Sequence, residues 1–389
     1  MKSRMTILEV GLLLGLALTV SFEAFAGSMV MRRFKGDVTL LGARGTPIEV
    51  VKDGFVPPGS TVITKSNGRC ILAASDGSIF KISPDSRVEV SSLMTAEEGS
   101  SATTSLLLAM GHVSAEVQKA IGDEETVRIV TMSAVAGVRG TAFDVVVGPD
   151  GQTTVQVTEG LVAVDSDQAE PIEVKPGNQV NADPERVGTV RGAETKKDWT
   201  AARRNASGKR LVSNVKSRFD GAREGVKRRS LKLQRVRSKL RDAARALRAA
   251  KASGASREEL RARRREVRRL RSKLNRIIEQ SMATIAWSSA VEALLSDPRF
   301  DQIPAKYVRR ELASLQAVRA SLDALAKEGR DLSQGSMEDM LKQNREGRRG
   351  TLRDSDGSAA DELFKSPTRP KKSGKGGKKK SGSSIFDDL

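Results

Sequence analysis

The hydrophobic pattern changes its period once along the chain, near residue 196, and this change limits the possible folds more than any other feature. Before it, short apolar runs alternate with turn residues such as Asn67-Gly68 and Asp150-Gly151. After it, apolar residues recur at alternating spacings of three and four. Short strands produce the first pattern and amphipathic helices produce the second. The chain is therefore predicted to be an α+β protein built of separate modules, with an all-β part before a helical part.

Residues 27–195 are predicted to form the all-β domain, as a sandwich, a barrel or a solenoid. The Asp-Gly and Asn-Gly pairs supply the positive φ angles that two-residue hairpin turns require. The spacing predicts short strands but leaves their order open. The expected strands are 37–41, 60–64, 69–74, 78–83, 87–90, 112–117, 126–130, 142–147, 153–158 and 161–164.

Residues 196–345 are predicted to form a helical region with a coiled-coil seam. A first helix is expected over 209–252, and Ser256 with Glu259 forms a capping box for a second helix that runs to about Ser296. A third helix is expected after Pro304. The short loop at Gly254 implies that the first two helices form an antiparallel hairpin. Large seam residues are sparse, which predicts a thin stalk that needs a partner or a homodimer.

The charge of the chain is divided unevenly between these two parts. The total is +19, but residues 27–195 carry 15 basic and 22 acidic residues, whereas residues 209–279 carry 26 basic and seven acidic ones. The cations of residues 209–279 repel one another unless an anionic partner neutralises them. Clustered cations are predicted to bind an anionic surface, and they are Lys227, Arg228, Arg229, Arg263, Arg264, Arg265, Arg268 and Arg269.

Several anionic partners fit this pattern. They are an anionic membrane, an acidic protein surface, nucleic acid, and the acidic β domain of the same chain. No aromatic residues interleave with the cations, as they do in single-strand nucleic-acid binders. Nucleic acid is therefore the minor alternative.

The two ends of the chain have compositions of their own. Residues 1–26 resemble a secretory signal peptide, with Lys2 and Arg4 before a short apolar run and Ala24-Phe25-Ala26 as the cleavage site. The alternative is that this segment stays uncleaved as an anchor. Residues 346–389 are rich in Lys, Gly and Ser and are predicted to be a disordered tail. The protein is therefore expected to be exported, to the periplasm or the cell surface.

The chemistry of the chain is restricted by its single His and single Cys. One Cys cannot build a disulfide framework, and a Cys/His zinc cluster needs more ligands. Cys70 lies in an apolar strand and is predicted to be a core residue, while His112 has no nucleophile or acid beside it in sequence. We therefore expect no catalytic residue, no metal and no cofactor.

Ordered motifs over residues 36–180 resemble the FecR domain family. They include Gly36-Asp37-Val38, the Asp76-Gly77-Ser78 turn and Glu159-Gly160. The most specific motif is 131–143, TMSAVAGVRGTAF, which is similar to the family's T-P-x-A-x-x-x-V-R-G-T-x-F. Its signature residues are Val138, Arg139, Gly140, Thr141 and Phe143.

The resemblance implies a non-enzymatic β module on the outer side of the cytoplasmic membrane. The residues themselves favour a structural role for the signature over a binding role. Gly140 suits a tight bend between two strands, and Arg139 is expected to cap carbonyl groups or to pair with an acid such as Asp144 or Glu159. The best-known members sense an outer-membrane transporter and signal to a sigma factor. We expect an exported interaction or scaffold module of the cell envelope, which binds an envelope protein or a cell-wall component through its β domain. A membrane-anchored signalling regulator is the alternative.

Overall fold

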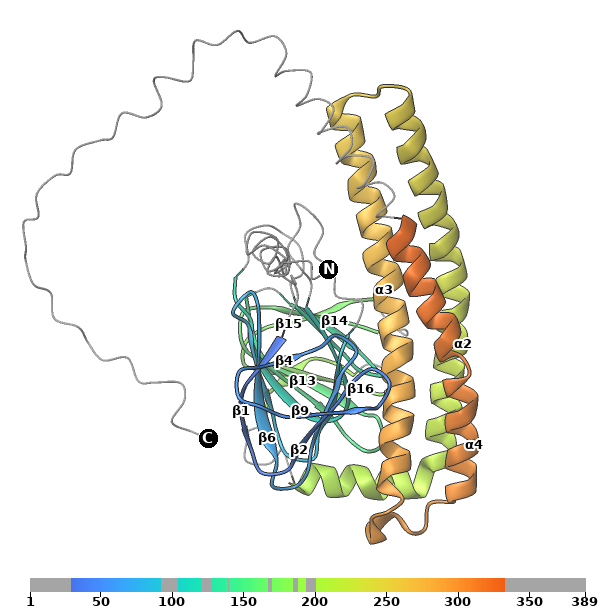
Figure 1. Ribbon diagram of the computed structural model, residues 1–389. Coiled ribbons are helices and arrows are strands. Elements are labelled where there is room, and N and C mark those ends of the chain that lie inside the picture. Colours follow the sequence, from blue (N-terminus) through green and yellow to red (C-terminus); the bar gives the residue numbers. More distant parts are fainter. Residues whose placement is uncertain are drawn as a thin grey trace, which may run out of the picture. The chain divides into compact units, whose positions relative to one another are not determined.

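The computed structural model describes residues 29–91, 104–119, 127–138, 140–166, 170–184, 188–193 and 201–332, with no side-chain description for 201–203 (Figure 1). The predicted signal peptide and the predicted disordered tail lie outside these residues. The described chain is a β-rich domain followed by helices, as the sequence predicts.

The described residues contain 17 strands in two sheets that share one long strand, β9 (Thr104–Glu116). Sheet A has the order β4-β1-β6-β7-β9-β12-β13-β16-β17, and sheet B has the order β3-β2-β5-β8-β9-β10-β11-β14-β15. All neighbours are antiparallel except β9 and β10. The strand bounds are β1 Met29–Lys35, β2 Val38–Leu41, β3 Pro47–Ile48, β4 Gly54–Val56, β5 Thr61–Thr64, β6 Arg69–Ala74, β7 Ile79–Ile82, β8 Arg87–Val90, β10 Val127–Val130, β11 Val135–Val138, β12 Ala142–Val147, β13 Thr153–Glu159, β14 Val162–Asp165, β15 Ile172–Val174, β16 Asn178–Ala182 and β17 Arg191–Gly192.

Strand β9 passes from one sheet to the other at Gly111. Up to Met110 it pairs with β8, and from Gly111 onward it pairs with β7 and β12. Gly111 has φ +105°, and a Cβ at this position would lie 2.2 Å from the Ser86 Oγ atom. Only glycine fits such a conformation without strain, so the crossing depends on this residue.

The inward faces of the two sheets enclose one apolar core. Sheet A contributes residues such as Leu72, Phe80 and Phe143, and sheet B contributes residues such as Val88 and Leu106, all of them fully buried. Because the two sheets pack face to face around this core, the domain is a β-sandwich, one of the predicted alternatives, and it is not a closed barrel in the part described.

The helices follow as α2 (Ala201–Ala252), α3 (Arg257–Leu294), the short η2 (Pro298–Phe300) and α4 (Ala305–Gln316), and residues 319–332 are also helical. Helices α2 and α3 form the predicted antiparallel hairpin, with Gly254 at φ +70° in the turn (Figure 1). The Ser256 Oγ atom accepts a hydrogen bond from the Glu259 backbone N–H, as the capping box predicts.

The first arm of the hairpin differs from its prediction in two ways. Helix α2 begins at Ala201, before the expected residue 209, and it is kinked at Asn214, where φ is −130°. The Asn214 Nδ2 atom donates to the Arg210 carbonyl, so the side chain bonds to the backbone of the preceding turn. Figure 1 shows the light green start of α2 lying at an angle to the rest of the helix.

The hairpin is also not a thin two-helix stalk. Residues of the third helical segment, such as Val308, Leu315 and Leu322, belong to the same buried cluster as the α2–α3 seam. That cluster also includes Leu107 and Val130 from the outer face of sheet B. The hairpin therefore finds its apolar partners within the chain, and the described molecule has three layers, which are sheet A, sheet B and the helices.

Candidate interaction surfaces

The interface between the β domain and the helices brings acids of the β domain against arginines of the helices. The Arg210 Nε atom lies 2.6 Å from Asp150 Oδ2, and the Arg276 Nη1 atom lies 3.0 Å from Asp165 Oδ2. Further pairs are Arg204 with Asp85, and Arg319 with Glu89 at 3.3 Å. The acidic β domain is thus one partner of the basic helices, which is the intramolecular alternative from the sequence.

In one further ion pair of this interface, the acid lies on a helix and the arginine lies in the β domain, and both side chains are buried. Glu279 of α3 is 1% exposed and accepts hydrogen bonds from Arg128 Nη1 at 2.9 Å and from Ser91 Oγ at 2.8 Å. Arg128 is 5% exposed. Burial of a charge is costly unless it is paired, and here both carboxylate oxygens are satisfied. The sequence does not reveal this pair, because its two charges are 151 residues apart.

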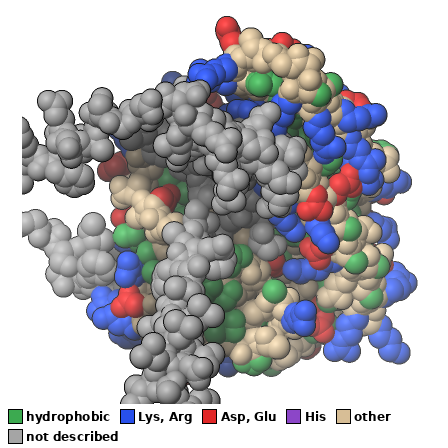
Figure 2. Space-filling model, turned by 45° about the horizontal axis from the view of Figure 1, so that its top comes forward, with side chains coloured by type: hydrophobic (Ala, Val, Ile, Leu, Met, Phe, Trp, Pro, Cys, Tyr) green, Lys and Arg blue, Asp and Glu red, His purple; other side chains and the backbone are tan. Residues whose placement is uncertain are grey.

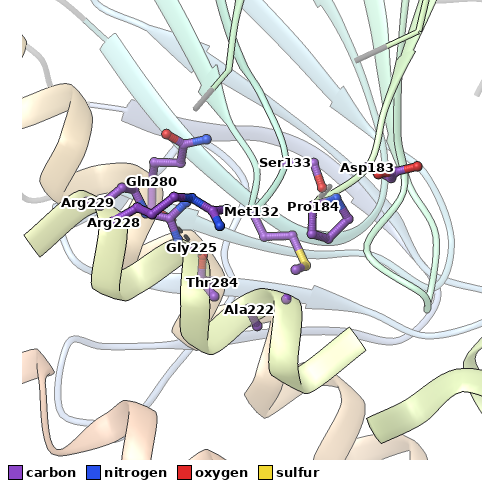
Figure 3. A pocket seen from close by; sticks show the side chains of 11 residues that line it. Met132, Ser133, Asp183, Pro184, Ala222, Gly225, Arg228, Arg229, Gln280 and Thr284 are labelled. Carbon is purple, nitrogen blue, oxygen red and sulfur yellow. Dashed lines mark hydrogen bonds between the residues drawn. The ribbon is translucent and has the colours of Figure 1, made fainter. Parts of the chain in front are cut away.

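Helices α2 and α3 and loops of the β domain line a small polar pocket, which Figure 3 shows from close by. Arg229 is one of the lining residues and is only 2% exposed, and its Nη2 atom donates to Thr284 Oγ1 at 2.7 Å. Its Nε atom donates to Ser281 Oγ at 3.2 Å. Gly225 makes room for this guanidinium, because a Cβ there would lie 3.3 Å from the Arg229 nitrogens. The prediction that Arg229 contacts an outside surface is therefore wrong, since the side chain joins α2 to α3.

The other predicted surface cations occupy varied environments. Lys227 is exposed and lies 3.9 Å from Glu224, and Arg228 is half-buried beside the pocket (Figure 3). Arg263 and Arg269 pair with acids one turn before them, Glu259 at 2.8 Å and Glu266 at 3.3 Å. Arg264 and Arg268 are half-buried and Arg265 is exposed; none of these three has a hydrogen-bond or ion-pair partner in the described part of the chain.

Among the described cations of the α2–α3 hairpin, most of those without a partner lie in the half near its turn. We define this distal half as residues 230–275. Figure 2 shows Lys and Arg side chains gathered on the side of the molecule where the helices lie. Among described residues, the distal cations with no ion-pair or hydrogen-bond partner are Arg235, Lys239, Arg248, Arg257, Arg261, Arg264, Arg265, Arg268 and Lys273. Three of the four acids in this half are already paired, namely Asp242, Glu259 and Glu266. The distal half therefore keeps a positive excess.

The signature residues of the β domain lie in or beside its core. Val138 and Phe143 are buried between the sheets, and Thr141 is 3% exposed. Gly140 has φ +61° at the bend between β11 and β12, where a Cβ would lie 2.3 Å from Lys119 Cγ. Arg139 lies outside the described residues. The placement of the other four fits a structural role.

A second polar cluster joins His112 to residues distant in sequence. The Ser83 Oγ atom lies 2.9 Å from His112 Nδ1, and Asp144 Oδ1 lies 2.9 Å from His112 Nε2. Strand pairing explains this contact, because β7 and β12 flank β9 in sheet A. Sequence reasoning missed it, since these neighbours are 29 and 32 residues away. Cys70 is buried as predicted, and burial raises the pKa of its thiol to about 12.

The fold defines the class of this protein as a two-sheet β-sandwich that carries a basic helical hairpin on one outer face. A family model described as FecR protein matches residues 60–163, from the start of β5 into β14. The chain therefore contains a FecR domain, as the motifs predicted. The strands before β5 and after β14 extend the same two sheets beyond the matched range.

Other comparisons are more distant. Two crystal structures of a protein provisionally named as an anti-sigma factor from Parabacteroides distasonis ATCC 8503 are similar at 15% identity, with TM-scores of 0.28 and 0.27. Each match covers 35% of this chain and 61% of the other, so it spans less than two thirds of that protein. No curated protein matches the chain. Among the described helices, none is both long and apolar enough to cross a membrane.

Proposed function

We propose that this chain is an exported, non-enzymatic FecR-domain protein that works as an interaction module of the cell envelope. Its distal hairpin half binds an anionic membrane surface, and its β domain binds an envelope protein or a cell-wall component. The observation that carries the proposal is the set of unpartnered cations on the distal half, on a hairpin that the β domain holds in place. FecR domains are generally associated with the envelope, which supports the predicted location.

The electrostatic argument rests on the contrast between the two ends of the hairpin. Near the β domain, arginines such as Arg210 and Arg276 are neutralised by acids of the sandwich. On the distal half, cations outnumber acids, and the nine cations named above have no partner among the described residues. A Lys or Arg near an anionic membrane contributes about 1 kcal/mol at most, and the effect falls off within a Debye length. Several unpaired cations on a held helix can therefore retain the protein at such a surface.

Binding to vesicles tests this role. The chain without residues 1–26 should bind vesicles of phosphatidylglycerol and phosphatidylcholine, should not bind phosphatidylcholine alone, and should be released by salt. The triple variant Arg235→Gln, Lys239→Gln and Arg248→Gln removes unpaired cations from α2. It should weaken binding by up to about a hundredfold, because three cations contribute up to about 3 kcal/mol.

A charge-matched control separates this surface from net charge. Lys209, Lys216 and Lys306 are exposed near the other end of the helices. Their replacement by Gln removes the same charge and should change vesicle affinity by less than about threefold. Equal weakening by the two variants, or binding that survives high salt, would refute the proposed surface.

The alternative function is a membrane-anchored envelope signalling regulator, which the FecR domain also supports. It requires that residues 1–26 remain attached as an anchor. Mass spectrometry of the protein isolated from its cells decides between the two, because a mature chain that begins at Gly27 has no such anchor.

A further inference from the structure

Four arginines form a line along α3 in the distal half of the hairpin. They are Arg257, Arg261, Arg264 and Arg268, spaced by four, three and four residues. Residues at this spacing lie on one face of a helix, and the line rises about 16 Å at 1.5 Å per residue. We call this set the arginine line. Arg257 and Arg261 are exposed, while Arg264 and Arg268 are half-buried.

The arginine line faces the same direction as the residues that attach α3 to the β domain. Asn275 and Glu279 lie seven and 11 residues after Arg268, about two and three helical turns further on, so they lie on the same face, and both are buried. Glu279 bonds to Arg128 and Ser91 of the β domain, so this face of α3 points toward sheet B. In Figure 1, α3 continues past the ends of the strands, so the first half of the helix extends beyond the sandwich. The arginine line therefore overhangs the end of the β domain.

Nothing in the described part of the chain neutralises the arginine line. None of its four members has a hydrogen-bond or ion-pair partner there. All four positions are Arg, and the first Lys after Arg257 is Lys273. A guanidinium differs from an ammonium in offering a planar fork of donors that fits a carboxylate with two parallel bonds.

We propose that the arginine line binds an acidic α-helical segment of a partner protein, with carboxylates repeating every three or four residues. The inference rests on the proposed function in taking the distal half as a binding surface, and it assigns this face to a protein partner. A helix laid alongside α3 would present Glu or Asp at the same spacing as the arginines. Each carboxylate would then accept both donors of one guanidinium fork.

The position of the arginine line favours a single acidic helix as partner over a membrane or a nucleic acid. A flat membrane pressed against this face of α3 would collide with the β domain, because that face points toward sheet B. The α2 cations of the vesicle experiment, such as Arg235, are instead exposed. A single-stranded nucleic acid is held by aromatic stacking, and the line has no aromatic member.

Two synthetic peptides of about 20 residues test the proposal by isothermal titration with the chain without residues 1–26. The aligned peptide is Ala-rich and carries Glu at alternating spacings of four and three. The scattered peptide has the same composition but places its Glu residues around the whole helix. The aligned peptide should bind at least about tenfold more tightly, because only it presents carboxylates along one face.

Three variants then separate the line from general charge. Arg257→Gln, Arg261→Gln, Arg264→Gln and Arg268→Gln together should reduce affinity for the aligned peptide at least about thirtyfold. The corresponding four Arg→Lys changes keep the charge but remove the forks, and should still cost about fivefold. The α2 variant Arg235→Gln, Lys239→Gln and Arg248→Gln should keep peptide affinity within about twofold while it loses vesicle binding. Circular dichroism verifies that each variant is folded.

Three results would overturn the proposal. Equal affinity for the two peptides would show that only total charge matters. A Lys variant that binds as tightly as the unmodified chain would exclude fork recognition. Inorganic polyphosphate that binds the line more tightly than the aligned peptide would assign the site to phosphate. Each result leaves the vesicle experiment on α2 unaffected, so the membrane surface and the arginine line can fail separately.

Discussion

Glu89 and Glu328 are both paired with arginine, yet the fold shifts their pKa values in opposite directions. Glu89 on β8 is 8% exposed, and burial raises its pKa even though Arg319 and Arg87 act to lower it. Glu328 accepts hydrogen bonds from Arg237 and Arg241, and these bonds lower its pKa. At the residue scale, the balance between burial and hydrogen bonding decides whether the pKa of a paired carboxyl rises or falls.

This contrast predicts opposite pH dependences for two single substitutions. Folded Glu89 holds its proton to a higher pH than in the unfolded chain, where the pKa is near 4.5, so its contribution to stability is present in acid and is lost as the pH rises through the folded pKa. Glu89→Gln should therefore gain stability relative to the unmodified chain as the pH rises above 4.5.

Glu328→Gln should behave in the opposite way. Its contribution is present above pH 4.5 and is lost as the pH falls through the lowered folded pKa. The variant should be less stable than the unmodified chain at neutral pH, and the difference should shrink in acid. Urea unfolding between pH 3 and 8 measures both differences. Parallel pH profiles for the two variants would contradict the assignment.

At the scale of elements, α3 connects the β domain to the other helices, because it packs against both. One face of it pairs with α2, and another packs on sheet B around Trp287, whose Nε1 atom donates to the Pro149 carbonyl at 3.0 Å. The buried Glu279–Arg128 pair lies in this second contact, while the Arg276–Asp165 pair at its edge has both side chains about one third exposed. These two pairs offer a direct comparison of buried and exposed charges on one helix.

Glu279→Ala should destabilise the chain by about 3–5 kcal/mol, because it leaves the Arg128 charge buried without a counterion. Arg276→Ala should cost less than about 1 kcal/mol, because solvent screens an exposed pair. The double variant Arg128→Met with Glu279→Met should recover much of the lost stability, since no unpaired charge remains. Chemical denaturation measures all three. An equal cost for the two alanine variants would contradict the role given to Glu279.

At the scale of the whole molecule, the sandwich and the helices are predicted to unfold together. Leu107 and Val130 on the outer face of sheet B, and Met132 in the turn after β10, are buried in the same cluster as the apolar residues of the helices. Helical circular dichroism and the fluorescence of Trp287, isolated by Trp199→Phe, should therefore report a single transition. The β domain alone, residues 27–195, should unfold at a lower denaturant concentration because this apolar face becomes exposed. An unchanged midpoint for the isolated domain would show that the two parts are independent.

Sequence patterns predicted most of the local structure correctly. The period of the apolar residues, the Gly254 turn and the Ser256 cap predicted the α2–α3 hairpin, because these signals depend only on near neighbours in the chain. The FecR motif predicted the β domain in the same way. The kink at Asn214 was missed, because nothing in the apolar spacing marks it.

The sequence by itself therefore determined the two kinds of structure, their order and the division of charge between them. Only the tertiary structure decided which charged side chains remain free to bind a partner. Arg229, Arg263 and Arg264 belong to similar basic runs, but Arg229 is buried against Ser281 and Thr284, Arg263 pairs with Glu259, and Arg264 has no described partner. Burial and long-range pairing depend on which distant segments meet, and periodicity carries no information about that. The net charge of +19 is thus set by the sequence, while the fold selects the part of it that can reach a partner.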